Sequence, residues 1–413
     1  MAETDPSASE GNPPLEPDRL EAIAETVGTP TYVYDARIIH RQADRLEEMF
    51  GDLPHRFLYA IKANFRPEIL RLLHGRGFGF DAVSPAEALL ARRHGAGADE
   101  ILYSANNLTD EEMIALREQG LLLNLGERSR LEKYGRSFPG SEVCLRLNPD
   151  VAAGHHDHVI TAGPKTKFGI PVDELEETRS LVEKYDLRVV GLHQHIGSGI
   201  LDVGTLWEAV RVLLQAAGAF PRVRFLNFGG GLGIPYRPEQ EEIAVDEVRS
   251  QITRRLQARA DDSDRGPEFW FEPGRYLVGP AGTLLTRVTT CKETSARRFA
   301  GCDTGLNHLL RPALYGSYHH ISNVSRTDGP TRTYDVVGNI CETGDYLARE
   351  RRLPEIREGD LLAVHDAGAY GRAMASHYNL RPMPAEVWID EGGDHRLVRD
   401  RQGPAALLDE LGL

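Results

Sequence analysis

Lys62 is the first residue whose type and position in the sequence suggest chemistry. It lies in "FLYAIKAN", where an apolar, strand-like run ends, and it is one of only six lysines in a chain of 413 residues. An amine beside apolar residues loses solvation, which lowers the pKa of its ammonium form and frees the nitrogen to form a Schiff base with a carbonyl compound. A lysine that only caps a strand, with its charged end in water, is the alternative.

The glycines of "NFGGGLGIP" suggest a binding site for a phosphate. Gly229, Gly230 and Gly231 follow an apolar run, and consecutive backbone N–H groups without side chains around them can surround an anion. A dinucleotide site would need these glycines after the first strand of the fold, with an acidic residue about 20 positions later. Here they come near the end of a long series of strands. A tight turn that requires glycine is the other interpretation.

The stretch "HQHIGSG" places two histidines, His193 and His195, on the same face of a strand. This spacing also occurs in metal sites, and "HHDH" at residues 155–158 adds candidate ligands, so a metal-dependent barrel hydrolase is an alternative interpretation. The other strand ends supply no further ligand set. We therefore expect His195 to stack on a flat cofactor, His193 to be structural, and residues 155–158 to belong to a surface loop or lid.

Charged residues also follow two further apolar runs. In "FEPGR", Glu272 can keep a pyridine nitrogen protonated, and Arg275 can bind a phosphate or a carboxylate. A surface ion pair is the alternative, although the apolar "FWF" that precedes Glu272 argues for burial. Asp81 ends the run "GFGFD" in the same way, and we count it with the cofactor-binding residues.

The elements that must position these residues alternate along the chain. Between residues 56 and 281, eight short β-rich runs are separated by helical stretches, several of which begin with Ser, Thr, Asp or Pro. Eight strand-then-helix units indicate an α/β fold of the (β/α)8, or TIM-barrel, type, in which reactive residues lie at the C-terminal ends of the strands. A doubly wound sheet is the structural competitor.

The character of the sequence changes after residue 281. Strand-like segments with turn residues between them predict a C-terminal β-rich domain, of sandwich or barrel-like form, and the early strand "TYVYD" is expected to join its sheet. We predict a disordered leader over residues 1–18, a barrel over 37–281, and a β-rich domain made of 19–36 and 282–413.

Composition excludes several classes of protein. A formal net charge of -14 argues against nucleic acid or an anionic membrane as the main partner, and no apolar run is long enough to span a membrane. Four scattered cysteines suggest free thiols in the reducing cytoplasm. The preference for arginine over lysine has no explanation in the sequence alone.

Six motifs in order, "YAIKAN", "HIGSG", "GGGLG", "EPGR", "GNICETGD" and "GAYGRAMASHYNLRP", closely resemble those of the fold-type III pyridoxal-phosphate decarboxylases. The resemblance extends from about residue 28 to the C-terminus. It implies that Lys62 binds pyridoxal 5'-phosphate covalently, that His195 stacks on its ring and that Glu272 holds the pyridine nitrogen in its charged form. The other cofactor-binding residues that it implies are Ser198, Gly229, Gly230, Gly231, Arg275 and Tyr370, and Asp81 is counted with them from its position at a strand end.

The same resemblance implies how a substrate is bound. Arg311 and Tyr315 match residues that bind the distal carboxylate of the substrate, and Arg275 and Tyr370 lie beside cofactor and substrate. Cys341 and Glu342 match a pair that reaches into the active site of the other subunit, so a homodimer is expected. Cys341 would return a proton to the α-carbon.

The activity implied is decarboxylation of meso-2,6-diaminopimelate to L-lysine and carbon dioxide. Related decarboxylases act on ornithine, D-ornithine or D-lysine, carboxynorspermidine or carrier-linked glutamate. Thr343, His377 and Leu380 depart from the usual pattern, so decarboxylation of another of these amino acids is the alternative. A catalytically inactive binding protein on the same fold is a third hypothesis, and the presence of both Lys62 and Cys341 argues against it.

Overall fold

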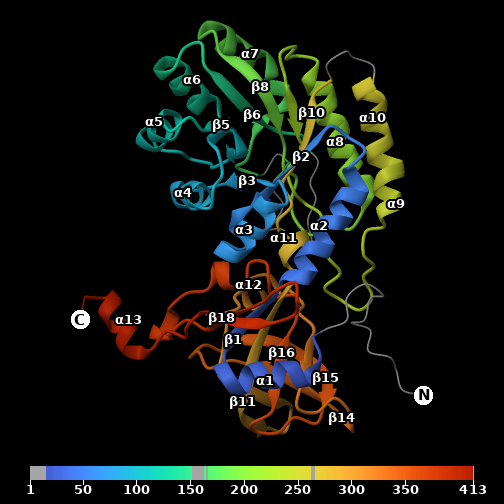
Figure 1. Cartoon of the computed structure of the whole chain (residues 1–413), viewed down its shortest axis with the longest axis vertical. Coiled ribbons are helices and arrows are strands. Elements are labelled where there is room, and N and C mark those ends of the chain that lie inside the picture. The colour runs from blue at the N-terminus through green and yellow to red at the C-terminus, as the bar shows by residue number, and fades with distance from the viewer. Residues whose placement is uncertain (1–14, 151–161, 164–165, 262–265, 413) are drawn as a thin grey trace. The chain divides into compact units, whose positions relative to one another are not determined.

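The computed structural model describes residues 15–150, 162–163, 166–261 and 266–412, without the side chains of 259–261. The chain forms two compact units (Figure 1). Unit 1 takes its described residues from Met1–Arg41, Pro235–Glu241 and Leu277–Leu413, and unit 2 from Gln42–Ile234 and Glu242–Tyr276. Each unit has its own sheet and its own core.

Unit 2 contains a closed barrel of eight parallel strands. Their order around the barrel is β2, β3, β4, β5, β6, β8, β9 and β10, and β10 pairs with β2 to close it. The sheet therefore has the predicted (β/α)8 form and is not doubly wound. The strands are β2 His55–Ala60, β3 Gly79–Ala82, β4 Ile101–Tyr103, β5 Leu122–Leu125, β6 Glu142–Asn148, β8 Arg188–His193, β9 Phe225–Asn227 and β10 Glu268–Phe271; the short β7 Ile170–Pro171 pairs with β6.

Helices follow the strands, and Figure 1 shows α4, α5, α6 and α7 outside them. Their starts agree with the sequence signals. The side chain of Ser84 accepts a hydrogen bond from the Glu87 N–H at 3.2 Å, and that of Thr109 from the Glu112 N–H at 3.1 Å. The helices are α2 Ala36–Phe50, α3 Pro67–Gly75, α4 Pro85–Arg93, α5 Asp110–Glu118, α6 Arg128–Ser137, α7 Leu175–Lys184, α8 Val203–Ala217, α9 Val245–Val248, α10 Arg254–Asp261 and α11 Arg275–Val278.

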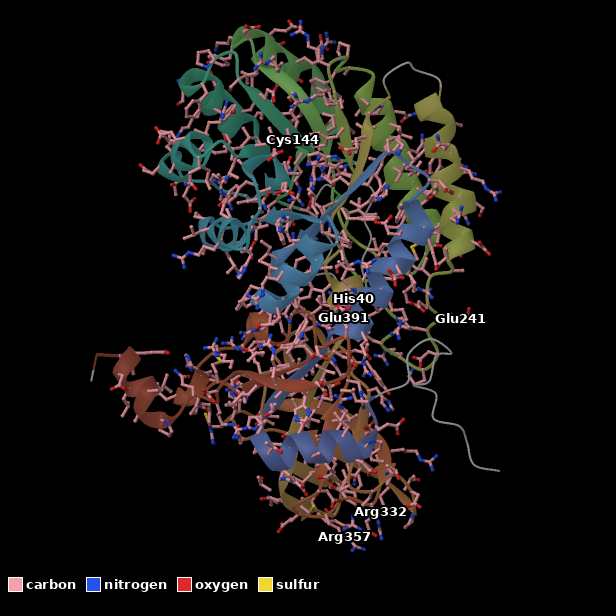
Figure 2. All side chains as sticks on the ribbon, in the orientation of Figure 1. His40, Cys144, Glu241, Arg332, Arg357 and Glu391 are labelled. Atoms are coloured by element: carbon pink, nitrogen blue, oxygen red, sulfur yellow. The ribbon has the colours of Figure 1, made fainter. Side chains whose placement is uncertain are left out.

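Apolar side chains fill the barrel. The Phe225 and Trp270 rings stack with their centres 3.7 Å apart, and a Cβ on Gly191 would lie 2.0 Å from the Phe225 ring, so only glycine fits there. Cys144 belongs to the same buried cluster, and burial raises the pKa of its thiol well above the ordinary value (Figure 2). The closed interior leaves the strand ends as the place for polar groups.

Unit 1 is built on a second sheet. The strand TYVYD (β1) pairs antiparallel with β11 and parallel with β17, which confirms that it joins the C-terminal strands. The strands are β1 Thr31–Asp35, β11 Gly282–Glu293, β12 Arg298–Cys302, β13 Ile321–Asn323, β14 Thr331–Val337, β15 Tyr346–Pro354, β16 Leu361–Val364, β17 Ala385–Ile389 and β18 His395–Arg399; the helices are α1 Pro17–Val27, α12 Arg311–Tyr315 and α13 Pro404–Glu410.

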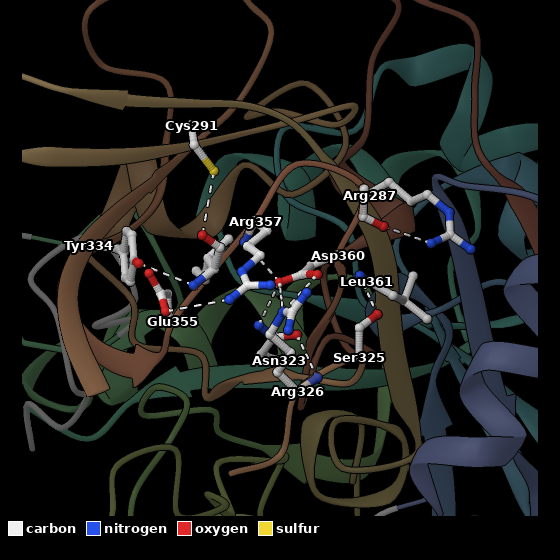
Figure 3. Close-up of polar contacts among 12 residues, drawn as sticks. Arg287, Cys291, Asn323, Ser325, Arg326, Tyr334, Glu355, Arg357, Asp360 and Leu361 are labelled. Carbon is white, nitrogen blue, oxygen red and sulfur yellow. Dashed lines mark hydrogen bonds and ion pairs between the residues drawn. The ribbon is translucent and has the colours of Figure 1, made fainter. Parts of the chain in front are cut away.

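Polar contacts join the loops of unit 1. Figure 3 shows Asn323 and Arg326 directed at the buried carboxylate of Asp360, which accepts hydrogen bonds at 3.1 Å from each. His40 and Glu391 form an ion pair at 2.8 Å (Figure 2). These contacts fix the strands of the β-rich unit and point to no ligand.

Three sequence features can be compared with the described chain. Residues 1–14 of the predicted leader lie outside the described residues, and α1 begins at Pro17, where proline in the first turn favours a helix start. In the described part of the chain, no helix is long and apolar enough to cross a membrane. Each of the four cysteines is a free thiol.

Candidate functional site

Lys62 lies just beyond the end of β2, in a short 3-10 turn over Ile61–Ala63. Its Nζ donates to Oδ2 of Asp81 at 2.5 Å, and Asp81 lies on the neighbouring strand β3, fully buried. Burial raises the pKa of the Asp81 carboxyl, and the charge of Glu272 acts in the same direction, whereas Lys62 opposes them. The other oxygen, Oδ1, is buried with no hydrogen-bond partner among the described residues. Asp81 therefore holds the amine at the strand ends through Oδ2, and its Oδ1 is a polar atom that can accept a hydrogen bond from another group.

Glu272 follows β10 and is held by two neighbouring strand ends. Its Oε1 accepts from Asn227 Nδ2 at 2.8 Å, and its Oε2 accepts from His193 Nε2 at 3.1 Å. Burial alone would raise the pKa of this carboxyl, but the charge and hydrogen bond of His193, with the charge of Lys62, lower it to about 2. The site therefore holds a buried carboxylate that stays ionised at neutral pH.

His195 follows β8 and is held in a neutral form. Burial lowers the pKa of its ring well below the ordinary value, and the positive charges of Lys62 and Arg146 act in the same direction. Its Nδ1 accepts a hydrogen bond from the Gly230 N–H at 3.1 Å, so the proton of the neutral ring is on Nε2. The flat, uncharged ring suits the stacking role predicted from the sequence.

Arg275 and Ser198 lie together. Arg275 is buried at the start of α11, and its Nε donates to Ser198 Oγ at 3.0 Å. The pair brings a guanidinium and a hydroxyl from segments 77 positions apart to one place. Both groups donate to phosphate oxygens in proteins, which fits the predicted binding of a phosphate.

The glycine loop differs from the predicted nest in its hydrogen bonds. The N–H of Gly229 donates to Asn227 Oδ1 at 2.8 Å, and the N–H of Gly230 donates to His195. The expectation that these two N–H groups would face an anion is therefore wrong, because side chains at the ends of β9 and β8 use them.

Close packing explains why glycine is needed in this loop. A Cβ on Gly229 would lie 2.3 Å from the Gln194 carbonyl oxygen, and one on Gly230 would lie 2.4 Å from the Glu272 carbonyl oxygen. Gly231 has φ +119°, a conformation that other residues rarely adopt. The loop passes tightly across three strand ends, and this holds His195 and Glu272 in place.

Two residues of this cluster were missed in the sequence. His193 was expected to be structural, yet it donates to Glu272, and Asn227 was assigned nothing, yet it contacts both Glu272 and Gly229. The signal for Asn227 was its position at the end of β9, immediately before the glycines. The signal for His193 was that its side chain lies on the same face of the strand as that of His195.

The two histidine rings have partners other than a metal. Within the described residues, no group of three or more His, Cys, Asp or Glu side chains is placed to hold a metal ion. Residues 155–158, which were candidate ligands, lie outside the described part. The HxH pair itself is engaged by Glu272 and Gly230.

Unit 1 holds four of the five residues predicted to bind substrate, Arg311, Tyr315, Glu342 and Tyr370, and the fifth, Arg275, belongs to unit 2. Arg311 begins α12 with 1% of its surface exposed, and its Nη1 donates to His319 Nε2 at 2.9 Å. Tyr315 ends the same helix and is half-buried. Tyr370, also half-buried, has φ +57°, which is uncommon for a residue other than glycine. Arg311 is therefore held within its unit by His319.

Cys341 and Glu342 lie on an exposed loop of unit 1. The N–H of Cys341 donates to Asn379 Oδ1 at 3.2 Å, and the Tyr378 hydroxyl donates to the Glu342 carboxylate. The buried carboxylate of Asp345 holds the loop, because it accepts a hydrogen bond from the Ile340 N–H of the loop at 2.7 Å and another from the Leu306 N–H, in a separate segment before α12, at 2.6 Å. The thiol therefore lies at the surface of its own unit, on an ordered turn.

Comparisons with known proteins agree with this geometry. The profile described as "Pyridoxal-dependent decarboxylase, pyridoxal binding domain" matches residues 36–279. Diaminopimelate decarboxylase of Methanothermobacter thermautotrophicus is 45% identical over 396 residues, which are 94% of this chain and 92% of that protein. The enzyme of the same name from Aquifex aeolicus is 36% identical over 393 residues, covering 93% and 91%. The crystal structure of diaminopimelate decarboxylase from Helicobacter pylori complexed with L-lysine superposes with a TM-score of 0.84 at 31% identity, covering 95% and 100%.

Proposed function

The chain belongs to the pyridoxal-dependent decarboxylases, and from this premise we propose that it converts meso-2,6-diaminopimelate to L-lysine and carbon dioxide. Relatives named for this reaction match at up to 45% identity over most of their length. The observation that carries the proposal is the barrel cluster, in which Lys62 lies against Asp81 while Glu272 is ionised and buried nearby.

The residues present fit pyridoxal 5'-phosphate. An aldehyde needs an amine, a pyridinium nitrogen needs an anion and a phosphate needs cationic or hydroxyl donors. Lys62, Glu272 and the Arg275–Ser198 pair supply these three groups. The unpartnered Oδ1 of Asp81 is a further polar contact beside the amine.

When bound, pyridoxal phosphate supplies an electron sink for the electron pair that remains after a carboxylate leaves as carbon dioxide. Lys62 would hold it covalently, with Asp81 positioning the Nζ atom. Glu272 would keep the ring nitrogen protonated, because its own pKa of about 2 leaves it charged. His195 would lie against the ring face, while Ser198, Gly231 and Arg275 would surround the phosphate.

Substrate recognition falls to unit 1 in this proposal. Arg311 would bind the distal carboxylate through its planar array of N–H donors, with Tyr315 and Tyr370 beside it. Glu342 suits the distal ammonium group. Arg311 is fixed by His319, so its orientation precedes the arrival of a ligand.

We also propose that the enzyme is a homodimer with shared active sites, located in the cytoplasm. In this arrangement Cys341 Sγ returns a proton to the substrate α-carbon in the other subunit, which the exposure of Cys341 in its own unit supports. The domain bounds 37–281 for the barrel and 19–36 with 282–413 for the β-rich part stay a prediction, and unit 1 differs from them by also taking residues 37–41, 235–241 and 277–281.

An absorption spectrum tests the cofactor assignment. Protein purified with added pyridoxal phosphate should show a visible absorption band that borohydride abolishes, and Lys62→Ala should lack the band. A colourless wild-type protein that binds stoichiometric zinc instead would contradict the proposal and favour the metal-dependent hydrolase. If wild type and Lys62→Ala both show the visible band, the role of Lys62 is refuted, whereas the assignment of the cofactor is not.

A further inference from the structure

The buried guanidinium of Arg311 is held by an uncharged partner. Nη1 of Arg311 donates to Nε2 of His319 at 2.9 Å, and His319 has no exposed surface. Nδ1 of His319 lies 2.9 Å from the backbone carbonyl oxygen of His365. A carbonyl can only accept, so Nδ1 carries the proton and Nε2 is left as an acceptor. The His365 carbonyl thus sets the tautomer that His319 needs to hold Arg311.

The local chain brings the two side chains together. Arg311 begins α12, and the helix ends at Gly316, which has φ +59° and terminates it in the left-handed conformation. The chain then turns back, so that His319 reaches the residue eight positions earlier. This return depends on a glycine, because other residues adopt that conformation only at a cost.

An aromatic ring completes the support. The guanidinium carbon of Arg311 lies 4.6 Å from the centre of the Tyr236 ring, and the same ring meets His319 edge-on with centres 5.4 Å apart. A ring face attracts a cation, and a planar guanidinium can stack on it. His319 and Tyr236 therefore restrict the guanidinium in two directions, one by a directed hydrogen bond and one by stacking.

We propose that His319, supported by Tyr236, is a positioning residue that orients Arg311 for the distal carboxylate of the substrate. The inference rests on the proposed function and extends it to residues that set specificity. The hydrogen bond from Nη1 to His319 sets the plane of the guanidinium. A guanidinium in a fixed plane is suited to bind the two oxygens of a carboxylate side by side.

A neutral hydrogen-bond partner leaves the positive charge of Arg311 able to attract a carboxylate. A carboxylate in the place of His319 would orient Arg311 equally well, but it would neutralise the charge that attracts the substrate carboxylate. Asp366 interacts electrostatically with Arg311, and burial raises the pKa of this carboxyl to about 7, despite the opposing effect of Arg311. The raised pKa weakens the tendency of Asp366 to place a negative charge beside Arg311.

Two substitutions at position 319 separate orientation from packing. In His319→Gln the side-chain amide can place its oxygen near the position of Nε2 and accept from Arg311. In His319→Asn the amide reaches only to the position of Nδ1, so the contact with the His365 carbonyl can remain while the Arg311 contact is lost. A purely structural role predicts similar effects for both variants.

The readouts are a KM-against-kcat comparison and ligand binding to the pyridoxal-phosphate-loaded enzyme. We expect His319→Asn to raise KM for meso-diaminopimelate roughly 10- to 100-fold, the scale of one hydrogen bond to a charged group, with kcat within about threefold of wild type. His319→Gln should remain within about threefold in KM. The Kd of L-lysine should rise with KM, while that of cadaverine, which has no carboxylate, should not change.

His308→Gln is the matched control. His308 is also buried, and it hydrogen-bonds to Thr304 and to the Pro382 carbonyl rather than to Arg311. It should lower thermal stability without changing KM or the Kd values. If His319→Asn does not fold, Tyr236→Leu keeps the inference testable, with an expected rise in KM of about three- to tenfold.

The outcomes divide clearly. Equal KM values for wild type, His319→Asn and His319→Gln, or a parallel rise for both variants and for cadaverine, would overturn the positioning role. Failure of the wild type to release carbon dioxide from meso-diaminopimelate would instead overturn the proposed function. In that case the ratio of L-lysine to cadaverine affinity, followed by cofactor absorbance, still decides whether His319 acts through Arg311.

Discussion

The barrel site is built from two acid–base pairs, Lys62 with Asp81 and His193 with Glu272. In the β-rich unit, by contrast, Arg311 is held by a neutral ring nitrogen of His319 and by the face of the Tyr236 ring. Asp81, His193, Glu272 and Arg311 are buried, whereas 34% of the Lys62 side chain is exposed. Both regions therefore keep a charge in a largely buried environment. The difference lies in how much of that charge the protein itself compensates.

This difference matches the tasks that we assign to the two regions. A site that fixes the protonation of a cofactor needs defined acid–base partners, and the pKa of about 2 for Glu272 arises from such partners. A site that attracts a carboxylate needs an oriented cation whose charge is still available. Substitutions in the barrel site and at Arg311 can test these two tasks separately, and the largest effect is expected in the barrel.

Removal of Lys62 should have the largest effect. In Lys62→Ala the covalent attachment is lost, and decarboxylation should fall on the order of 10⁴-fold or more, as when an essential nucleophile is removed. The measurement is carbon dioxide release alongside the visible absorption band. If Lys62→Ala kept both carbon dioxide release and the visible band, the role proposed for the barrel site would be contradicted.

Glu272→Gln should reduce kcat by roughly 10²- to 10³-fold, the scale for loss of one preorganised electrostatic group. Glutamine keeps the shape and can still accept from Asn227, but it cannot hold a protonated ring nitrogen by charge. The visible band should shift in position while the cofactor remains bound, as followed by absorbance after gel filtration. An unchanged kcat would show that an ionised carboxylate is not needed there.

Arg311→Ala should act on the substrate and leave the cofactor untouched. We expect a loss of roughly 10²-fold in kcat/KM for meso-diaminopimelate, since a buried charge partner is removed. Steady-state kinetics and the cofactor spectrum measure the two parts separately. Turnover equal to wild type would refute the role of Arg311, and loss of the cofactor band would show that the residue acts through the fold.

The smallest effect is expected for His308, whose protonation should lower the free energy of unfolding at acid pH. Burial lowers the pKa of this histidine to about 4 from an ordinary 6.5. The unfolded chain therefore takes up the proton first as pH falls, and the free energy of unfolding should decrease between pH 6.5 and 4 by up to about 3 kcal/mol. Urea unfolding at pH 7 and pH 4.5 measures this. His308→Asn should show a smaller decrease than wild type, and an equal decrease would contradict the assignment.

The sequence allowed much of the barrel to be predicted. Each of the eight runs forms a barrel strand, because β-rich runs between capped helices are a strong local signal. In the β-rich unit, the strand-like segments of the sequence contain β1, β11, β14, β16, β17 and β18, whereas β12, β13 and β15 lie outside them and were not predicted. Their pairing partners lie far along the chain, and periodicity in a short window cannot show them.

Individual residues of the site could be predicted from the sequence, but the contacts between them could not. Lys62 and Glu272 could be found from strand ends, but the contact between His193 and Glu272 spans 79 positions, and only the closed barrel brings them together. The N–H groups of Gly229 and Gly230 were assigned to an anion, whereas side chains take them. His319 was given no role from the sequence, because the chain reversal at Gly316 that directs it at Arg311 is not visible there.

The central claim is that this chain decarboxylates meso-diaminopimelate with pyridoxal phosphate bound to Lys62. Carbon dioxide release should be measured for wild type and Lys62→Ala with meso-diaminopimelate, L-lysine, ornithine and arginine as separate substrates. We predict release from meso-diaminopimelate alone, with L-lysine as the product, and none with Lys62→Ala. Faster release from ornithine or lysine, or release that persists in Lys62→Ala, would contradict the claim.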